Sequence, residues 1–288
     1  LARKWGYEKK NVPENKAVNL FCKNNFWGRT ISAISSSSNE SSFRNFGPFT
    51  AGFELIEYNN LQVLEQKLKS DPNIVSLMVE PIQGEAGIIV PKKNYLKKAH
   101  DLCKKYNVLL ICDEVQTGLG RCGKLLASDY EKVKPDILIL GKSLSGGFYP
   151  LSGVLSSSEI MDVIKPGQHG STYGGNPLAC ALGEEAIKIV IEENLIQNSY
   201  NMGKYFRNEL INLDIETVVD VRGRGLFNAI EFKDAKCAKK ALKQLVKNGL
   251  LSQITREKVI RLCPPLIINK KQIEKSLEII KKSLIKVK

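Results

Sequence analysis

Three short polar segments of this 288-residue chain each follow directly on a run of apolar residues that predicts a buried strand. They are 80–87 (EPIQGEAG), 113–118 (DEVQTG) and 141–147 (GKSLSGG). In open sheets of parallel strands, ligands bind beyond the carboxyl ends of the strands. Acids and lysines buried at such positions acquire perturbed pKa values and often take part in catalysis. We therefore expect the chemistry of this protein to reside in these segments.

Lys142 and Asp113 form the most specific pair of candidate residues. Gly141-Lys142-Ser143 suggests a phosphate-binding loop, but Asp136 stands where that motif needs its first glycine. A lysine that ends a buried strand and precedes small residues can instead react with an aldehyde to form a Schiff base. Asp113 ends the preceding strand, where a carboxylate can keep a pyridinium nitrogen protonated. Each residue alone could be an ordinary surface lysine or a strand-end cap, so the prediction rests on the pair.

The pattern of apolar residues predicts the elements that carry these segments. Short apolar runs predict strands at 73–80, 108–112, 136–140 and 151–155, and helical spacing predicts a helix over 94–106. This alternation is typical of an open α/β sheet with parallel crossover connections. Polar residues 35–42 predict a loop.

The second half of the chain has a different pattern. We expect helical structure over 177–213, strands within 217–232, a helix over 238–248, a strand at 259–262 and a last helix over 271–285. This order predicts an α+β domain that follows a boundary near 195–215.

Composition excludes several classes of protein. Hydrophobic residues make up 43% and charged residues 25%, as in globular proteins, and the apolar runs are too short to cross a bilayer. The net charge is +13, but only nine of the 43 basic residues are Arg, and Lys is spread along the predicted helices. This favours a solvated surface over nucleic-acid binding. We thus expect neither a nucleic-acid nor a membrane partner.

Cysteine and histidine usage argues against a disulfide framework and against a metal centre. The seven Cys show no CxxC spacing, and there are only two His. We expect no metal, and a reducing compartment: the cytoplasm, with the mitochondrial matrix as the alternative. No GxGxxG follows a strand, which argues against a dehydrogenase.

Longer motifs identify a family resemblance. DEVQTGLGR (113–121), ILGKSLSGG (139–147) and HGSTYGGNP (169–177) resemble the signatures of the class III, fold-type I pyridoxal phosphate (PLP) aminotransferases. Within that class, NFWGRTISAISSS (25–37), VEPIQGEAG (79–87) and VIRLCPPLII (259–268) are most similar to the ornithine aminotransferase group. The resemblance covers nearly the whole chain with the motifs in the family's order. It implies an α/β fold with a mostly parallel sheet, divided into a PLP-binding large domain (1–200, incomplete at its amino terminus) and a small α+β domain (201–288).

The resemblance also implies the cofactor-binding residues. Lys142 would be the catalytic lysine that holds PLP and moves the substrate proton, and Asp113 would pair with the pyridine nitrogen. The remaining contacts would be Gln116 at the phenolic oxygen, Val115 and Phe26 on the two faces of the ring, and Ser171 and Thr172 at the phosphate. Thr172 would reach the phosphate of a second subunit, so the resemblance implies a homodimer with shared active sites.

Three further residues would handle the substrates, ornithine and 2-oxoglutarate. Arg29 would bind the α-carboxylate of ornithine, because the planar guanidinium suits a carboxylate. Arg261 would bind the α-carboxylate of 2-oxoglutarate or glutamate. Glu85 would pair with Arg261 during the ornithine half-reaction and swing away during the other.

Alternative functions remain open at this point. Acetylornithine or 4-aminobutyrate aminotransferase would keep the chemistry and change the substrate, an aminomutase would not need two carboxylate sites, and a non-catalytic basic α/β binding module would lack the chemistry altogether. Full-length members of the family carry a segment that precedes the start of this chain. We accordingly expect residues 1–288 alone to have much impaired activity.

Overall fold

The computed structural model describes residues 1–285 and 287. Contacts between Cα atoms group the chain into two units. The first unit contains 1–81, 91–116 and 128–186, and the second contains 82–90, 117–127 and 187–288. Two short segments of the first half of the chain thus belong to the second unit. The division into domains at residue 200 stays a prediction.

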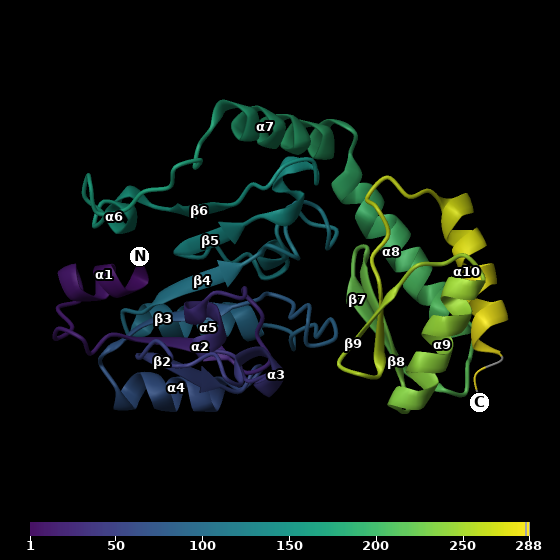
Figure 1. Cartoon of the computed structure of the whole chain (residues 1–288), viewed down its shortest axis with the longest axis horizontal. Coiled ribbons are helices and arrows are strands. Elements are labelled where there is room, and N and C mark those ends of the chain that lie inside the picture. The colour runs from purple at the N-terminus through teal and green to yellow at the C-terminus, as the bar shows by residue number, and fades with distance from the viewer. Residues whose placement is uncertain (286, 288) are drawn as a thin grey trace. The chain divides into compact units, whose positions relative to one another are not determined.

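The first unit is built on a six-stranded sheet with the strand order β2-β1-β3-β4-β5-β6 (Figure 1). The strands are β1 (Val18–Cys22), β2 (Phe53–Ile56), β3 (Ile74–Val79), β4 (Leu109–Asp113), β5 (Ile137–Leu140) and β6 (Gly153–Ser156). The first five are parallel, and β6 pairs with β5 in the antiparallel direction. The expected mostly parallel sheet is therefore confirmed. The exception is β6, because the chain returns directly from the carboxyl end of β5 without a helix that would carry it back across the sheet.

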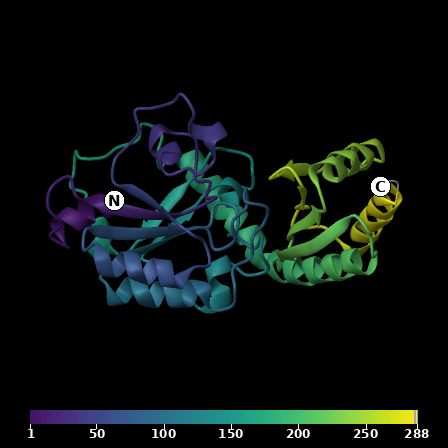
Figure 2. The ribbon, with the colours of Figure 1, turned by 90° about the horizontal axis from the view of Figure 1, so that it is seen from below.

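Alternate residues of the central strands pack into two cores, one on each face of the sheet. On β4, Leu110 and Cys112 join one core, while Leu109 and Ile111 join the other. The first core includes residues of α4 (Leu61–Ser70) and α5 (Tyr95–Lys105), which lie together on one face (Figure 2). Because both faces are covered, the strands read as continuous apolar runs.

Short helices complete the first unit. They are α1 (Ala2–Glu8), α2 (Ile31–Ser35), α3 (Glu40–Phe43), the 3-10 helices η1 (Ala127–Glu131) and η2 (Lys142–Ser145), α6 (Ser158–Met161) and most of α7 (Pro177–Glu192). The prediction of a loop over 35–42 is wrong at its ends, where α2 finishes and α3 begins. Side-chain caps explain this result: Thr30 accepts from the Ala33 N–H at the start of α2, and Asn39 accepts from the Ser41 N–H at the start of α3.

The second unit packs three helices against one face of an antiparallel sheet of order β7-β8-β10-β9. Its strands are β7 (Val218–Arg224), β8 (Phe227–Phe232), β9 (Gln253–Thr255) and β10 (Val259–Leu262). Its helices are α8 (Leu195–Asn212), α9 (Ala235–Lys247) and α10 (Lys270–Leu284). Ile230, Phe232 and Ile260 face the helices in one core cluster.

The predicted fold class is confirmed: a mostly parallel α/β sheet is followed by an α+β region. The predicted strand at 259–262 has the observed bounds, and the helical stretch over 177–213 is two helices, α7 and α8. Within residues 1–285 and 287, no helix combines the length and apolarity needed to cross a bilayer.

Candidate active site

The carboxyl ends of β3, β4 and β5 bring the first residues of the three polar segments to one edge of the first unit's sheet. Val79 pairs with Cys112, and Asp113 pairs with Ile139. Asp113 is the last residue of β4 and therefore lies between the end of β3, which precedes Glu80, and the end of β5, which precedes the turn that carries Lys142. Parallel pairing of neighbouring strands produces this row.

Asp113 is a buried carboxylate with an unusual pKa. Its exposed fraction is 7%, and burial raises its pKa from 3.8 to about 6. A hydrogen bond of 3.0 Å from the Val115 N–H and the positive charge of Lys142 oppose this rise. The charge of Lys142 thus acts on Asp113.

Lys142 begins a 3-10 turn with a strained backbone. Its φ is +47°, in the left-handed region that residues other than glycine rarely adopt, and its side chain is exposed. Gly146 and Gly147 also have positive φ and let the chain turn toward β6. A Cβ placed on Gly141 would lie 3.5 Å from the methyl groups of Val115, so Val115 packs beside the lysine turn.

Phe26 and Arg29 lie together in the segment that follows β1. The Arg29 guanidinium lies over the Phe26 ring, 5.4 Å from its centroid. The Phe26 N–H donates to Glu80 Oε1 at 3.0 Å, which ties Phe26 to the end of β3. Glu80 is 7% exposed and was not among the predicted site residues, although its position at the end of an apolar strand is the signal that identified Asp113.

The remaining predicted cofactor residues are Gln116, Ser171 and Thr172. Gln116 is half-buried at the end of its segment. Ser171 and Thr172 lie in an exposed loop, where Ser171 Oγ accepts from the Gly174 N–H at 3.1 Å. In the described part of the chain, neither hydroxyl bonds to another predicted site residue.

Glu85 and Arg261 form an ion pair within the second unit. Arg261 Nη1 lies 2.6 Å from Glu85 Oε1, and Arg261 Nη2 donates to Gln253 Oε1 at 2.7 Å. The side chains of Arg261 and Glu85 are 18% and 35% exposed. Thr255 Oγ1 donates to the Glu85 carbonyl at 2.6 Å. Sequence reasoning missed Gln253, which β9–β10 pairing places opposite Arg261, and Thr255, which bonds to the loop that carries Glu85.

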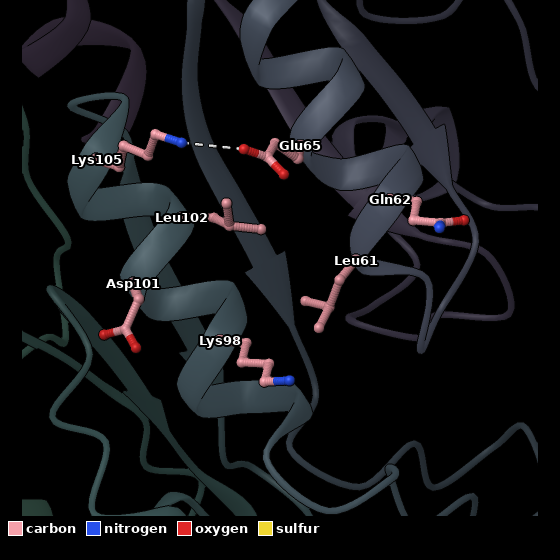
Figure 3. Close-up of a pocket in the computed structure, with 7 residues that line it drawn as sticks. All are labelled: Leu61, Gln62, Glu65, Lys98, Asp101, Leu102 and Lys105. Carbon is pink, nitrogen blue, oxygen red and sulfur yellow. Dashed lines mark hydrogen bonds and ion pairs between the residues drawn. The ribbon is translucent and has the colours of Figure 1, made fainter.

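A groove on the surface of the first unit lies away from this row of strand ends. It encloses about 360 Å³ between α4 and α5 (Figure 3). Its lining residues are Leu61, Gln62, Glu65, Lys98, Asp101, Leu102 and Lys105. An ion pair of 3.0 Å joins Lys105 to Glu65 across it. None of the predicted site residues lines the groove, and we assign it no role in catalysis.

The residues at the strand ends fit a pyridine aldehyde cofactor. Asp113 offers a buried carboxylate for a ring nitrogen, Lys142 offers an exposed amine, and Val115 offers apolar surface beside them. Among the described residues, no group of three or more His, Cys, Asp or Glu could hold a metal ion.

Comparisons with known proteins agree with this description. The family model described as Aminotransferase class-III matches residues 1–284. The mitochondrial ornithine aminotransferase of Drosophila melanogaster is 55% identical over 285 residues, which are 99% of this chain and 66% of that protein. The mitochondrial ornithine aminotransferase of Rattus norvegicus is 51% identical over 287 residues, 99% of this chain and 65% of that protein. The chain thus spans slightly less than two thirds of the length of these relatives.

Solved structures show the same fold. An ornithine aminotransferase from Toxoplasma gondii, described with partial occupancy of PLP at its active site, superposes with a TM-score of 0.97 at 49% identity. The match covers 99% of this chain and 68% of that one. An acetylornithine aminotransferase from Elizabethkingia anophelis gives a TM-score of 0.87 at 45% identity, over 99% of this chain and 69% of that one. The chain belongs to the class-III aminotransferase family.

Proposed function

We propose that the whole protein transfers the δ-amino group of ornithine to 2-oxoglutarate with PLP as cofactor, giving glutamate 5-semialdehyde and glutamate. Relatives named ornithine aminotransferase, at 55% and 51% identity, support this substrate. The structure supports it through one observation, the ion pair between Arg261 and Glu85 at 2.6 Å.

This ion pair suits an enzyme with two amino donors. Ornithine would react at its δ end, which has no carboxylate beside the reacting carbon, whereas glutamate would react at a carbon that carries its α-carboxylate. Glu85 neutralises the Arg261 guanidinium when no carboxylate is present. A substrate α-carboxylate can take the place of Glu85, because a guanidinium binds either carboxylate through the same donors. Gln253 holds the other nitrogen of Arg261 in both cases.

The residues at the strand ends would carry out the proton transfers. When bound, PLP supplies an aldehyde for the amine and a ring that withdraws electrons from the amino-bearing carbon. Asp113, mostly ionised at neutral pH with a pKa of about 6, would hold a proton at the ring nitrogen. Lys142 Nζ would accept the proton from the substrate carbon and return it. Val115 and Phe26 would keep water from the ring faces, Gln116 would donate to its phenolic oxygen, and Arg29 would hold the ornithine α-carboxylate near the mouth.

A homodimer completes the proposed site. Ser171 and Thr172 lie in an exposed loop, beside Tyr173, which is 78% exposed. Phe148 in the same unit is 87% exposed. Large exposed aromatic residues are typical of interfaces. In a second copy, this loop would bring Thr172 to the cofactor phosphate.

The proposed compartment is the cytoplasm or the mitochondrial matrix. The seven cysteines are free thiols, as expected in a reducing compartment. Both relatives cited above are named mitochondrial, which favours the matrix.

Absorption spectroscopy of the full-length protein with PLP tests the proposed function. We expect a visible band that ornithine bleaches and that the Lys142→Ala variant lacks. Acetylornithine is the second candidate donor, because the enzyme from Elizabethkingia anophelis named for it has a similar structure. Bleaching by acetylornithine or 4-aminobutyrate, and not by ornithine, would replace the proposed substrate. A protein without any band would contradict the function as a whole.

A further inference from the structure

Loop 82–90, which carries Glu85, lies on the face of the second unit's sheet that the helices leave uncovered. In this sheet, Arg222 pairs with Ala229, Ala229 with Arg261, and Arg261 with Gln253. Residues directly opposite one another on antiparallel strands share a face. These four side chains therefore form a row across the sheet on the face opposite to Ile230 and Ile260, which pack against the helices.

Both arginines of this row bind the loop, from opposite sides. They stand two strands apart, about 10 Å. Arg261 forms an ion pair with the Glu85 carboxylate, while Arg222 binds backbone carbonyls that begin two residues later in the loop. Arg222 Nη2 and Nε donate to the Gly87 carbonyl at 2.6 Å and 3.0 Å, and Nε also donates to the Ile88 carbonyl at 3.2 Å. Ala229 lies between the arginines and is fully buried, so only a methyl group separates them.

The charge of Arg222 is already matched by carboxylates of the sheet. Its Nη1 lies 2.7 Å from Asp220 Oδ2 and 2.6 Å from Glu231 Oε2, and its side chain is 16% exposed. These ion pairs aim the remaining nitrogens at the loop carbonyls. Arg222 thus differs from Arg261, whose carboxylate partner Glu85 lies on the loop and would be exchanged for a substrate carboxylate under the proposed function.

The loop itself is closed by its own backbone. Gln83 and Ile89 form a bridge, and the Gly87 and Ile88 N–H groups both donate to the Gly84 carbonyl at 3.1 Å. Thr255 holds the Glu85 carbonyl. Arg222 holds the opposite side of the loop through the Gly87 and Ile88 carbonyls. We propose that Arg222 is a positioning residue that holds loop 82–90 on the sheet so that Glu85 can reach and mask Arg261.

The proposal rests on the proposed function and predicts an effect on specificity. Without the Arg222 fork, the loop lifts and Glu85 no longer masks Arg261. The α-carboxylate of glutamate should still bind Arg261. Ornithine can now bind with its own α-carboxylate on Arg261 and present the wrong amino group. The loss should therefore fall on the ornithine half-reaction.

Arg222→Lys and the control Arg207→Lys in the full-length PLP enzyme test this proposal. Arg207 is also half-buried in the second unit and donates to a backbone carbonyl, that of Gly225 at 2.7 Å. We expect Arg222→Lys to lower kcat/KM for ornithine about tenfold or more and to leave glutamate within about twofold. Arg207→Lys should not change the ratio of kcat/KM for ornithine to kcat/KM for glutamate. In a Glu85→Gln background, Arg222→Lys should have no further effect on that ratio, because it acts through Glu85.

Amide hydrogen exchange of the same proteins provides a second readout. Arg222→Lys should speed exchange at Gly87, Ile88 and Ile89, and Arg207→Lys should not. Equal losses with both donors, or unchanged exchange in the loop, would overturn the proposal. A wild-type enzyme that reacts with glutamate but not with ornithine would contradict the proposed function instead. In that case the exchange experiment would still test Arg222: faster loop exchange in Arg222→Lys would support its positioning role, and unchanged exchange would overturn it.

Discussion

Lys142, which we propose as the reactive lysine, has a backbone conformation with a free-energy cost. A left-handed conformation costs a residue with a Cβ about 1–2 kcal/mol. Such strain concentrates at functional sites, where the surrounding structure maintains it. Here Lys142 lies between the end of β5 and the positive-φ glycines at 146 and 147, within a 3-10 turn.

Replacing Lys142 by glycine or alanine separates this strain from the chemistry. Both variants should lose the visible band of bound PLP. In the cofactor-free protein, Lys142→Gly should be more stable than Lys142→Ala by about 1 kcal/mol, because only glycine adopts a φ of +47° without strain. Urea unfolding of the two variants measures the difference. Equal stabilities would show that the backbone there carries no strain.

Asp113 predicts a dependence of stability on pH. Its pKa is about 6 in the folded chain and 3.8 ordinarily, so between these values the folded state holds a proton that the unfolded state has released. The contribution of Asp113 to the free energy of unfolding therefore falls as the pH rises through this range. In the cofactor-free protein, the free energy of unfolding of Asp113→Asn should exceed that of the wild type by about 1 kcal/mol at pH 4.5 and by about 3 kcal/mol at pH 7. Denaturant unfolding at the two pH values checks this; a gain that does not grow with pH would contradict the raised pKa.

The helix α8 shows how closely elements approach within the second unit. A Cβ on Gly203 would lie 1.7 Å from the Gly225 carbonyl oxygen, in the turn between β7 and β8. The helix thus contacts the hairpin backbone directly, and Ser199 one turn earlier accepts from the Leu226 N–H at 3.2 Å. This contact fixes the hairpin that carries Arg222.

Gly203→Ala should therefore be strongly destabilising. Alanine is the better helix former, but the overlap with backbone atoms cannot be relieved by a side-chain rotation. We expect a loss of about 3 kcal/mol or more in the free energy of unfolding. The exposed neighbour Lys204→Ala serves as the control and should change it by less than about 0.5 kcal/mol. Thermal unfolding of the two variants measures these changes. Similar losses of stability in Gly203→Ala and Lys204→Ala would contradict the close contact at Gly203.

Amphipathic elements were the easiest to predict from sequence. The predicted helix over 94–106 is α5, whose buried residues Leu96, Ala99 and Cys103 recur at helical spacing. Strands β1 and β2 were not predicted, because each is short and contains polar residues whose partners come from elsewhere in the sheet. Asn19 in β1 is an example, since its amide oxygen accepts from Ser76 of β3 at 2.7 Å.

At the scale of the whole molecule, the proposed dimer predicts that each active site takes residues from two chains. Full-length Lys142→Ala lacks the lysine, and Thr172→Val lacks the phosphate contact, so neither alone should be active. When the two variants are unfolded and refolded together in equal amounts, half of the dimers are mixed. Each mixed dimer has one site with Lys142 from one chain and Thr172 from the other, so about a quarter of the wild-type activity should return. If Thr172 served its own chain, no activity would return.

Residue types and their order along the chain were enough to predict the fold class and the family. The apolar runs that precede Asp113 and Lys142, and the motifs around these two residues, can be read locally, because strand period and strand ends are local properties. The tertiary structure decided which distant residues act together. The pairing of β7, β8, β10 and β9 places Arg222, Arg261, Gln253 and Thr255 around Glu85, more than 130 positions away. Strand pairing brings residues together irrespective of their separation in sequence. The pattern of side chains along one strand does not specify which strand it pairs with.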